Sequence, residues 1–218
     1  NYPDIIQLGD VLDVKPSDLP KIDLLIGGSP CQGFSFAGHQ LNFDDTRSKL
    51  FFEYVRLLKA LKPKYFMLEN VRMKKESMDV ITNMLGVEPI AINSNFVSAQ
   101  NRYRLYWTNI PIHGQPKDRG IVLKDIIESG FVDRDKSHCI DANYFKGGNL
   151  KSYHEKNRRQ LVFSDAVTWR KLTPLECERL QTVPDNYTNH VSNTQRYRML
   201  GNGWTIEVIK HIFQGMQE

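Results

Sequence analysis

The chain has 218 residues, of which 40% are hydrophobic and 25% charged, and its formal net charge is +4. This composition is typical of a globular protein, and the length suits one α/β domain with a small second lobe. No apolar run approaches the length of a membrane-spanning helix, and the first residues do not resemble a signal peptide. Three scattered cysteines are too few for a disulfide framework or a zinc site, which favours a reducing, intracellular setting without a bound metal.

The charge is unevenly distributed along the chain. Residues 102–171 contain 14 Lys/Arg and 8 Asp/Glu, so this region carries an excess of six positive charges and the remainder is mildly acidic. A basic region beside an acidic one predicts an anionic polymer as the partner. A basic face that is merely solvated is the alternative.

The first hundred residues alternate between strand and helix patterns. A short apolar run at 22–28 predicts a buried strand, and helical spacing of apolar residues at 48–63 predicts a helix that stops at Pro63. A second strand is predicted at 64–70, and a helix at 78–86 with Gly86 as its C-cap. The segments PIAINSNFV and RLYWTNI are further strand candidates. This rhythm predicts an α/β fold with a doubly wound, mostly parallel sheet.

The rhythm breaks between Pro111 and about Val167, where apolar runs are short and glycines frequent. We interpret this stretch as a small, loop-rich lobe. A helix is then predicted within 172–184, with Thr173 as its N-cap, and a last helix begins near Trp204. The predicted division is therefore a main domain at 1–110, a small lobe at 111–168, and a segment at 169–218 that returns to complete the main domain.

Chemically capable residues follow two of the predicted strands. Cys31 comes directly after the first, in the stretch DLLIGGSPCQGFS, and Glu69 and Asn70 end the second. Because the carboxyl ends of parallel strands meet at one edge of a sheet, we expect these groups in one crevice. Cys31 is then a candidate nucleophile and Glu69 a candidate acid. A buried thiol and a capping carboxylate are the structural alternatives.

Five motifs occur in one order along the chain: GGSPCQGFSFAG, ENV, QNRYRLYW, LTPLECERLQTVPDNY and LGNGWTIEVI. Together they resemble the cytosine C5 DNA methyltransferase family, and the resemblance covers Gly9 to about Phe213. The resemblance implies a Rossmann-like fold that depends on S-adenosylmethionine. It also implies double-stranded DNA as the substrate, with the target cytosine extruded from the helix.

The resemblance assigns roles to four catalytic candidates. Cys31 would add to cytosine C6, which makes C5 nucleophilic toward the methyl group, and Glu69 would hold N3 and the exocyclic amine. Arg104 would hold the O2 side of the base, and Arg102 would support the loop or a phosphate. Only one of the two arginines is expected to face the pocket, and the resemblance favours Arg104.

The resemblance also implies two sets of binding residues. The cofactor would be held by Asp10, Val11, Pro30, Leu50, Asn202, Gly203 and Trp204. Candidates for contact with nucleic acid are Gln32, Ser35, Arg47, Asn70, Gln100, Lys146, Arg158 and Arg159. Residues 33–47 would form a loop that closes over the extruded base, and the small lobe at 111–168 would be the target-recognition region.

The sequence departs from the family pattern at its start. The glycine-rich F-x-G-x-G turn and the acidic residue that follows it are absent from these 218 residues. An upstream segment or a partner chain is expected to supply them, and the chain alone is expected to bind S-adenosylmethionine weakly. Micromolar affinity in a calorimetric titration would contradict that expectation.

Two other functions stay open at this point. A tRNA cytosine-5 methyltransferase would share the scaffold, and a catalytically silent DNA-binding or regulatory relative would explain the absent cofactor motif. The expected location is the cytoplasm of a prokaryote or a phage-infected cell, or the nucleus in a eukaryote.

Overall fold

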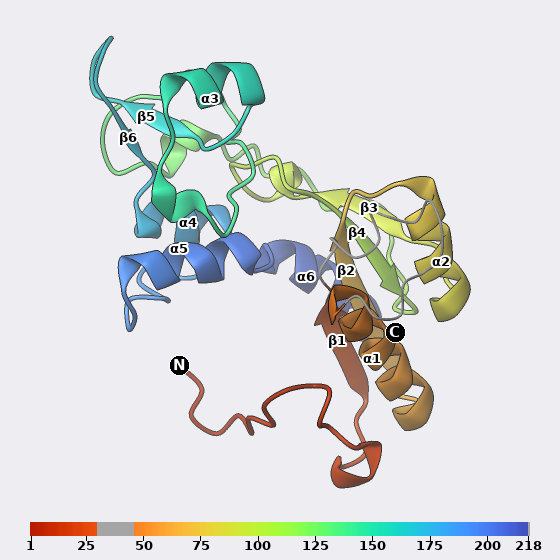
Figure 1. Ribbon diagram of the computed structural model, residues 1–218. Helices are drawn as coiled ribbons and strands as arrows, with labels where there is room; N and C mark the ends of the chain where they lie inside the picture. Colours follow the sequence, from red (N-terminus) through yellow and green to blue (C-terminus); the bar gives the residue numbers. More distant parts are fainter. Residues whose placement is uncertain (30–45, 218) are drawn as a thin grey trace. The chain divides into compact units, whose positions relative to one another are not determined.

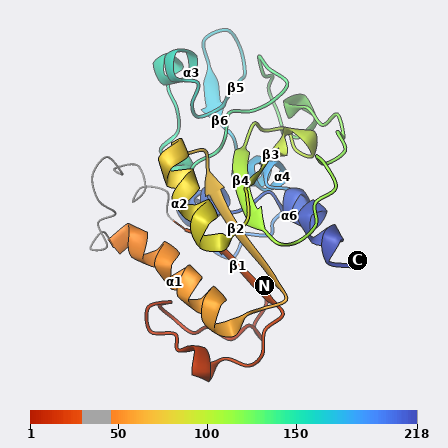
Figure 2. The same cartoon turned by 90° about the vertical axis from the view of Figure 1, so that its right-hand side faces the viewer.

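The computed structural model describes residues 1–29 and 46–217, and the chain forms two compact units (Figures 1 and 2). The first unit comprises Asn1–Ile92, Tyr103–Ile112 and Gly215–Glu218, and the second comprises Asn93–Arg102 and His113–Gln214. The functional division at 110 and 168 stays a prediction. Within the described part of the chain, no helix has the length and apolar character needed to cross a membrane.

The first unit is built on a four-stranded sheet with the order β1-β2-β4-β3. Its strands are β1 (Leu24–Gly28), β2 (Tyr65–Val71), β3 (Ile90–Asn93) and β4 (Tyr103–Thr108). β1 and β2 are parallel, as predicted, whereas β4 runs antiparallel to β2. Only residues 94–102 join β3 to β4, which is shorter than the crossover that a parallel connection needs. The α/β class is therefore confirmed, and the sheet is mixed.

Two helices cover one face of this sheet. α1 (Thr46–Leu61) and α2 (Lys75–Leu85) pack with alternate residues of β2 and β4 in a single apolar cluster, in which Phe51, Leu68 and Trp107 are fully buried. Gly86 ends α2 at a φ of 72°, as the sequence predicts. α1 ends two residues before Pro63, because Lys62 already takes a left-handed φ of 45°. A 3₁₀ turn, η1 (Pro16–Asp18), precedes β1.

The second unit has little regular structure. It contains α3 (Leu150–Lys156), a hairpin of β5 (Leu161–Phe163) and β6 (Trp169–Lys171), and the helices α4 (Pro174–Leu180), α5 (Asn193–Asn202) and α6 (Ile206–Phe213). Short 3₁₀ turns complete it, and a separate apolar cluster lies among α4, α5 and the preceding loops. The stretch 111–167 is loop-rich, as expected, although α3 and β5 interrupt it.

Two buried carboxylates organise the second unit. Glu176 completes the predicted capping box with Thr173, whose hydroxyl accepts from the Glu176 N–H at 3.1 Å. Glu178, also fully buried, accepts hydrogen bonds from the Thr188 hydroxyl and from Arg196, the latter at 2.9 Å. Buried carboxylates persist only with such partners, so both are structural.

Candidate active site

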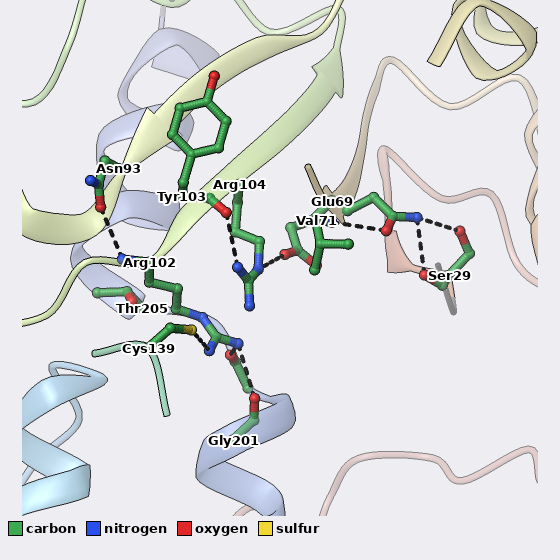
Figure 3. A network of polar contacts seen from close by, with 12 residues as sticks. Ser29, Glu69, Val71, Asn93, Arg102, Tyr103, Arg104, Cys139, Gly201 and Thr205 are labelled. Carbon is green, nitrogen blue, oxygen red and sulfur yellow. Dashed lines mark hydrogen bonds and ion pairs between the residues drawn. The ribbon is translucent and has the colours of Figure 1, made fainter. Parts of the chain in front are cut away.

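Glu69 and Arg104 form an ion pair on adjacent strands of the first unit (Figure 3). The Arg104 Nε lies 2.8 Å from the Glu69 Oε1, and the two side chains are only 14% and 12% exposed. Glu69 is paired in register with Gly28 of β1 on one side and with Tyr106 of β4 on the other. The predicted neighbourhood of the two strand ends is therefore present, and a carboxylate and a guanidinium are held there together.

Asn70 ties the end of β2 to the end of β1. The residue is 2% exposed, and its side-chain amide donates to the Ser29 carbonyl at 3.1 Å and to the Ser29 hydroxyl at 3.2 Å. The Asn70 Oδ1 accepts from the Val71 N–H at 2.8 Å. The buried amide is therefore used within the protein, and it fixes the last described residue before the segment that contains Cys31.

A hollow of about 250 Å³ lies at the carboxyl end of β1. Val11 and Leu50, two predicted cofactor residues, line it together with Gly28 and Tyr54. Gly27 allows the Tyr54 ring to approach the backbone of β1, because a Cβ at position 27 would lie only 3.0 Å from the ring. Burial raises the pKa of the Tyr54 phenol, which donates to the Leu25 carbonyl. Apolar walls and bare glycine backbone suit a flat or aliphatic part of a ligand.

Asp10 has a local role in the structure. Its Oδ1 accepts from the Leu12 N–H at 3.0 Å, which closes a turn of the kind that aspartate favours, and the residue is exposed. It is not among the residues that line the hollow, although Val11 beside it is.

Arg102 occupies a different environment from Arg104. Residues two apart on a strand share a face, but β4 begins at Tyr103, and Arg102 belongs to the second unit. Its guanidinium, in a residue 4% exposed, donates to the carbonyls of Ile140, Gly201 and Gly203 at 3.0, 3.1 and 2.7 Å. These bonds within the protein make Arg102 a clamp between the loop that contains Ile140 and the C-terminal end of α5, and the guanidinium is not at the surface for a phosphate.

The other predicted residues of the second unit divide between core and surface. Gln100 is fully buried and donates to the Leu180 carbonyl at 2.7 Å, so it is not exposed for contact with nucleic acid. Asn202 is exposed and Trp204 half-buried, at the end of α5, and Gly203 caps that helix.

The basic candidates lie on loops of the second unit. Lys146 and Arg158 are exposed, and Arg158 pairs with Asp141 at 3.1 Å. Arg159 donates to the Gly147 carbonyl at 2.7 Å from a left-handed backbone with a φ of 59°. Four predicted residues lie outside the described residues: Pro30, Cys31, Gln32 and Ser35. Arg47 is in the first turn of α1, and nothing is described of its side chain.

Sequence reasoning missed the supporting residues of both units. Ser29 and Gln181 lie within two of the five motifs but were assigned no role, yet Ser29 accepts from Asn70, and the Gln181 amide donates to the Leu200 carbonyl at 2.5 Å. Gly27 could have been found, because a glycine inside an apolar strand indicates close approach by another group. The described residues contain no cluster of three or more His, Cys, Asp or Glu that could hold a metal.

The family model for C-5 cytosine-specific DNA methylases matches residues 1–110 and 93–218, and the chain belongs to this family. Among its curated relatives is the Type II methyltransferase M1.ScrFI of Lactococcus lactis subsp. cremoris, which is 30% identical over 96% of this chain and 66% of its own length. M.NlaX of Neisseria lactamica is 30% identical, over 96% of this chain and 80% of its own length. M.NgoBV of Neisseria gonorrhoeae is 39% identical over 60% of this chain, but only 36% of its own length.

Solved structures agree on the fold. An Entamoeba histolytica methyltransferase, EhMeth, has a TM-score of 0.72 at 15% identity and covers all of this chain and 85% of its own. The Dnmt2 methyltransferase of S. pombe has a TM-score of 0.68 at 17% identity and covers 97% of this chain and 85% of its own. At such identities the likeness concerns the fold alone.

Proposed function

We propose that the chain is the catalytic part of a DNA (cytosine-5)-methyltransferase that acts on a cytosine extruded from duplex DNA. Family membership supports the reaction class, and the ion pair of Glu69 with Arg104, both partly exposed beside the end of β1, carries the residue-level assignment. Cytosine presents N3, O2 and an exocyclic amine on one edge. A carboxyl group and a guanidinium, side by side, match that pattern of donors and acceptors.

In the proposed reaction the Cys31 thiolate forms a bond to C6, and the electron pair of the C5–C6 double bond becomes available at C5. Glu69 keeps a proton at N3, which neutralises the charge that develops on the ring, and Arg104 donates to O2. C5 takes the methyl group, then loses its proton to a base, and elimination of the thiolate restores the double bond.

S-adenosylmethionine would supply an electrophilic methyl group on a sulfonium, and the sulfur would keep the electron pair of the broken S–CH3 bond as a neutral thioether. Val11, Leu50 and the glycine backbone of β1 would hold part of it in the hollow beside Tyr54. Asn202, Gly203 and Trp204 are proposed to contribute from the second unit. Association with a companion endonuclease is a further proposal, supported by the Type II names of the relatives.

A trapping experiment tests this function. The chain is incubated with S-adenosylmethionine and duplex DNA that contains 5-fluorocytosine, with tRNA as the alternative substrate. Because fluorine at C5 prevents the loss of a proton, the thioether to Cys31 is expected to persist as a covalent adduct. Cys31→Ser should form none, whereas Cys139→Ser, with a different thiol removed, should still form it.

The remaining outcomes separate the alternatives. An adduct with tRNA alone would make the chain an RNA methyltransferase. No adduct with either substrate, together with retained binding of DNA, would favour a silent DNA-binding relative.

A further inference from the structure

Three aromatic residues lie in register across a small sheet in the second unit. Phe163 of β5 is paired with Trp169 of β6, and an antiparallel bridge pairs it with Phe131 on its other side. Residues directly opposite each other in adjacent strands share a face, so the three side chains form an aromatic row. The Phe131 and Phe163 rings stack with centroids 5.9 Å apart. Phe131 is 52% exposed and Trp169 37%.

The aromatic row has a fixed base. Gly130 has a φ of 89°, and a Cβ there would lie 2.6 Å from the Phe163 carbonyl oxygen, so glycine is required for this strand to approach β5. The inner side of Phe163 meets the ring of Tyr153 from α3, with centroids 6.0 Å apart, and Tyr153 is fully buried. The exposed rings therefore stand on a supported surface.

The charge around the aromatic row favours an anionic partner. Residues 146–171, which include α3 and the hairpin, contain seven Lys/Arg and two Asp/Glu. Lys151, Lys156 and Arg158 are exposed on or after α3, the helix that supplies Tyr153. A second copy of the chain that docked through the same segment would repel it. Three side chains also provide far less area than the roughly 800 Å² per partner of a stable protein interface.

We propose that the aromatic row binds unstacked bases of DNA, with the cationic segment 146–171 holding the phosphates. Aromatic side chains on a sheet surface accept bases by stacking, and this contact tolerates any sequence because every base has a flat face. DNA as the partner rests on the proposed function, in which a cytosine leaves the helix and its neighbours lose a stacking partner.

Equilibrium binding measured by fluorescence anisotropy tests the proposal. The probes are a labelled single-stranded oligonucleotide and a duplex with one unpaired base. Phe131→Ser/Trp169→Ser should weaken binding of both by about fivefold to 150-fold, the range for loss of one stacked base. The slope of affinity against salt should stay unchanged, because no phosphate contact is lost. Phe163 is kept, since it also packs on Tyr153.

Two control variants make the result specific. Val191→Ser removes an exposed apolar side chain elsewhere in the same unit and should leave affinity within twofold of the original chain. Lys156→Ser/Arg158→Ser should reduce the salt slope by up to about two, because that slope counts released counterions.

Unchanged affinity in the double aromatic variant would overturn the proposal. So would a dimer of the original chain that the double variant converts to a monomer without loss of DNA affinity, because the row would then be a self-association surface. Failure of the proposed function is distinguishable. If no 5-fluorocytosine adduct forms but DNA binding still depends on Phe131 and Trp169, the methyltransferase assignment falls and the binding surface stands.

Discussion

The two units bury different kinds of side chain. Of the 14 buried polar side chains among the described residues, 11 belong to the second unit, whereas the first unit contributes Asn70, Ser77 and Thr108. The first unit is held by apolar packing of helices on a sheet, and Glu69 and Arg104, to which the proposed function gives a chemical role, are not part of that packing. The second unit is held by carboxylates, amides and a guanidinium in its interior. The buried polar groups of the second unit therefore serve its fold, whereas the proposed chemistry of the first unit depends on Glu69 and Arg104, which lie outside the buried set.

The largest expected effect concerns activity. Glu69→Gln should lower methyl transfer about 10²-fold to 10⁴-fold, the range for loss of general acid catalysis. Transfer of a radiolabelled methyl group to duplex DNA measures this rate, and DNA binding should persist. Glu76→Gln, on an exposed part of α2, is the control. Unchanged turnover would contradict the acid role of Glu69. It would also remove the proposed functional difference between this carboxylate and the structural carboxylates of the second unit.

The matching change in the second unit should affect stability. Glu178→Ala leaves Arg196, whose side chain is 13% exposed, without its carboxylate, and should cost about 3–5 kcal/mol in the free energy of unfolding. Burial opposes ionisation of Glu178, but hydrogen bonds from Thr188 and Arg196 outweigh it and lower its pKa. The stabilisation is therefore present at neutral pH and lost as the pH falls through the lowered folded-state pKa.

Urea unfolding measures this change, with Glu155→Ala on the exposed surface of α3 as the control, expected within about 0.5 kcal/mol of the original chain. A double variant, Glu178→Leu/Arg196→Met, should recover part of the loss, because an apolar pair leaves no unpaired charge. A Glu178→Ala chain as stable as the original would show that the buried carboxylate is not structural.

Truncation of a buried apolar side chain tests whether apolar packing stabilises the first unit. Leu68 of β2 is fully buried in the apolar cluster that includes residues of α1 and α2, and Leu68→Ala should cost about 2–5 kcal/mol through lost transfer energy and a residual cavity. Ile6→Ala, at a side chain 83% exposed, should change little. Equal midpoints for the two variants in urea would contradict an apolar core at this sheet.

The smallest expected effect is a pH dependence in the second unit. Burial and the nearby positive charge of Arg134 lower the pKa of His138, whose Nε2 lies 2.5 Å from the Arg134 guanidinium. The facing groups are Tyr153 and Asp133, and hydrogen bonding from Arg134 holds the Asp133 pKa at about 2, so Asp133 stays ionised. The folded state therefore binds the His138 proton less readily than the unfolded chain, and stability falls as the pH drops below about 6.5.

Thermal unfolding at pH 7.5 and 5.5 should show this decrease as roughly 1 kcal/mol or less, the scale of partly exposed charges. His138→Gln should reduce it, while His190→Gln, at an exposed position, should not. A pH dependence that His138→Gln leaves intact would assign the effect to other groups.

The sequence predicted features that depend on local pattern. The Thr173 cap, the Gly86 C-cap and the parallel neighbours β1 and β2 follow from spacing and composition, and all three are present. The direction of β4 was not predictable from its apolar pattern, because parallel and antiparallel strands can have the same pattern of apolar residues.

The interior of the second unit was harder to predict. Gln100 and Arg102 lie in a motif that implies contact with DNA, yet their partners are main-chain carbonyls far along the chain. No local pattern encodes such pairings. Glu69 with Arg104 was within reach of the sequence because both lie in family motifs.

The clamp made by Arg102 has a consequence for the order in which the protein can fold as it leaves the ribosome. All four strands of the sheet have been synthesised by Thr108, so that sheet can assemble early. The Arg102 guanidinium can form its hydrogen bonds to Gly201 and Gly203 only after these residues, 99 and 101 positions later, have been synthesised. Closing so long a loop is also slow. A nascent chain arrested shortly before Gly201 should therefore carry a protease-resistant sheet attached to a still digestible remainder.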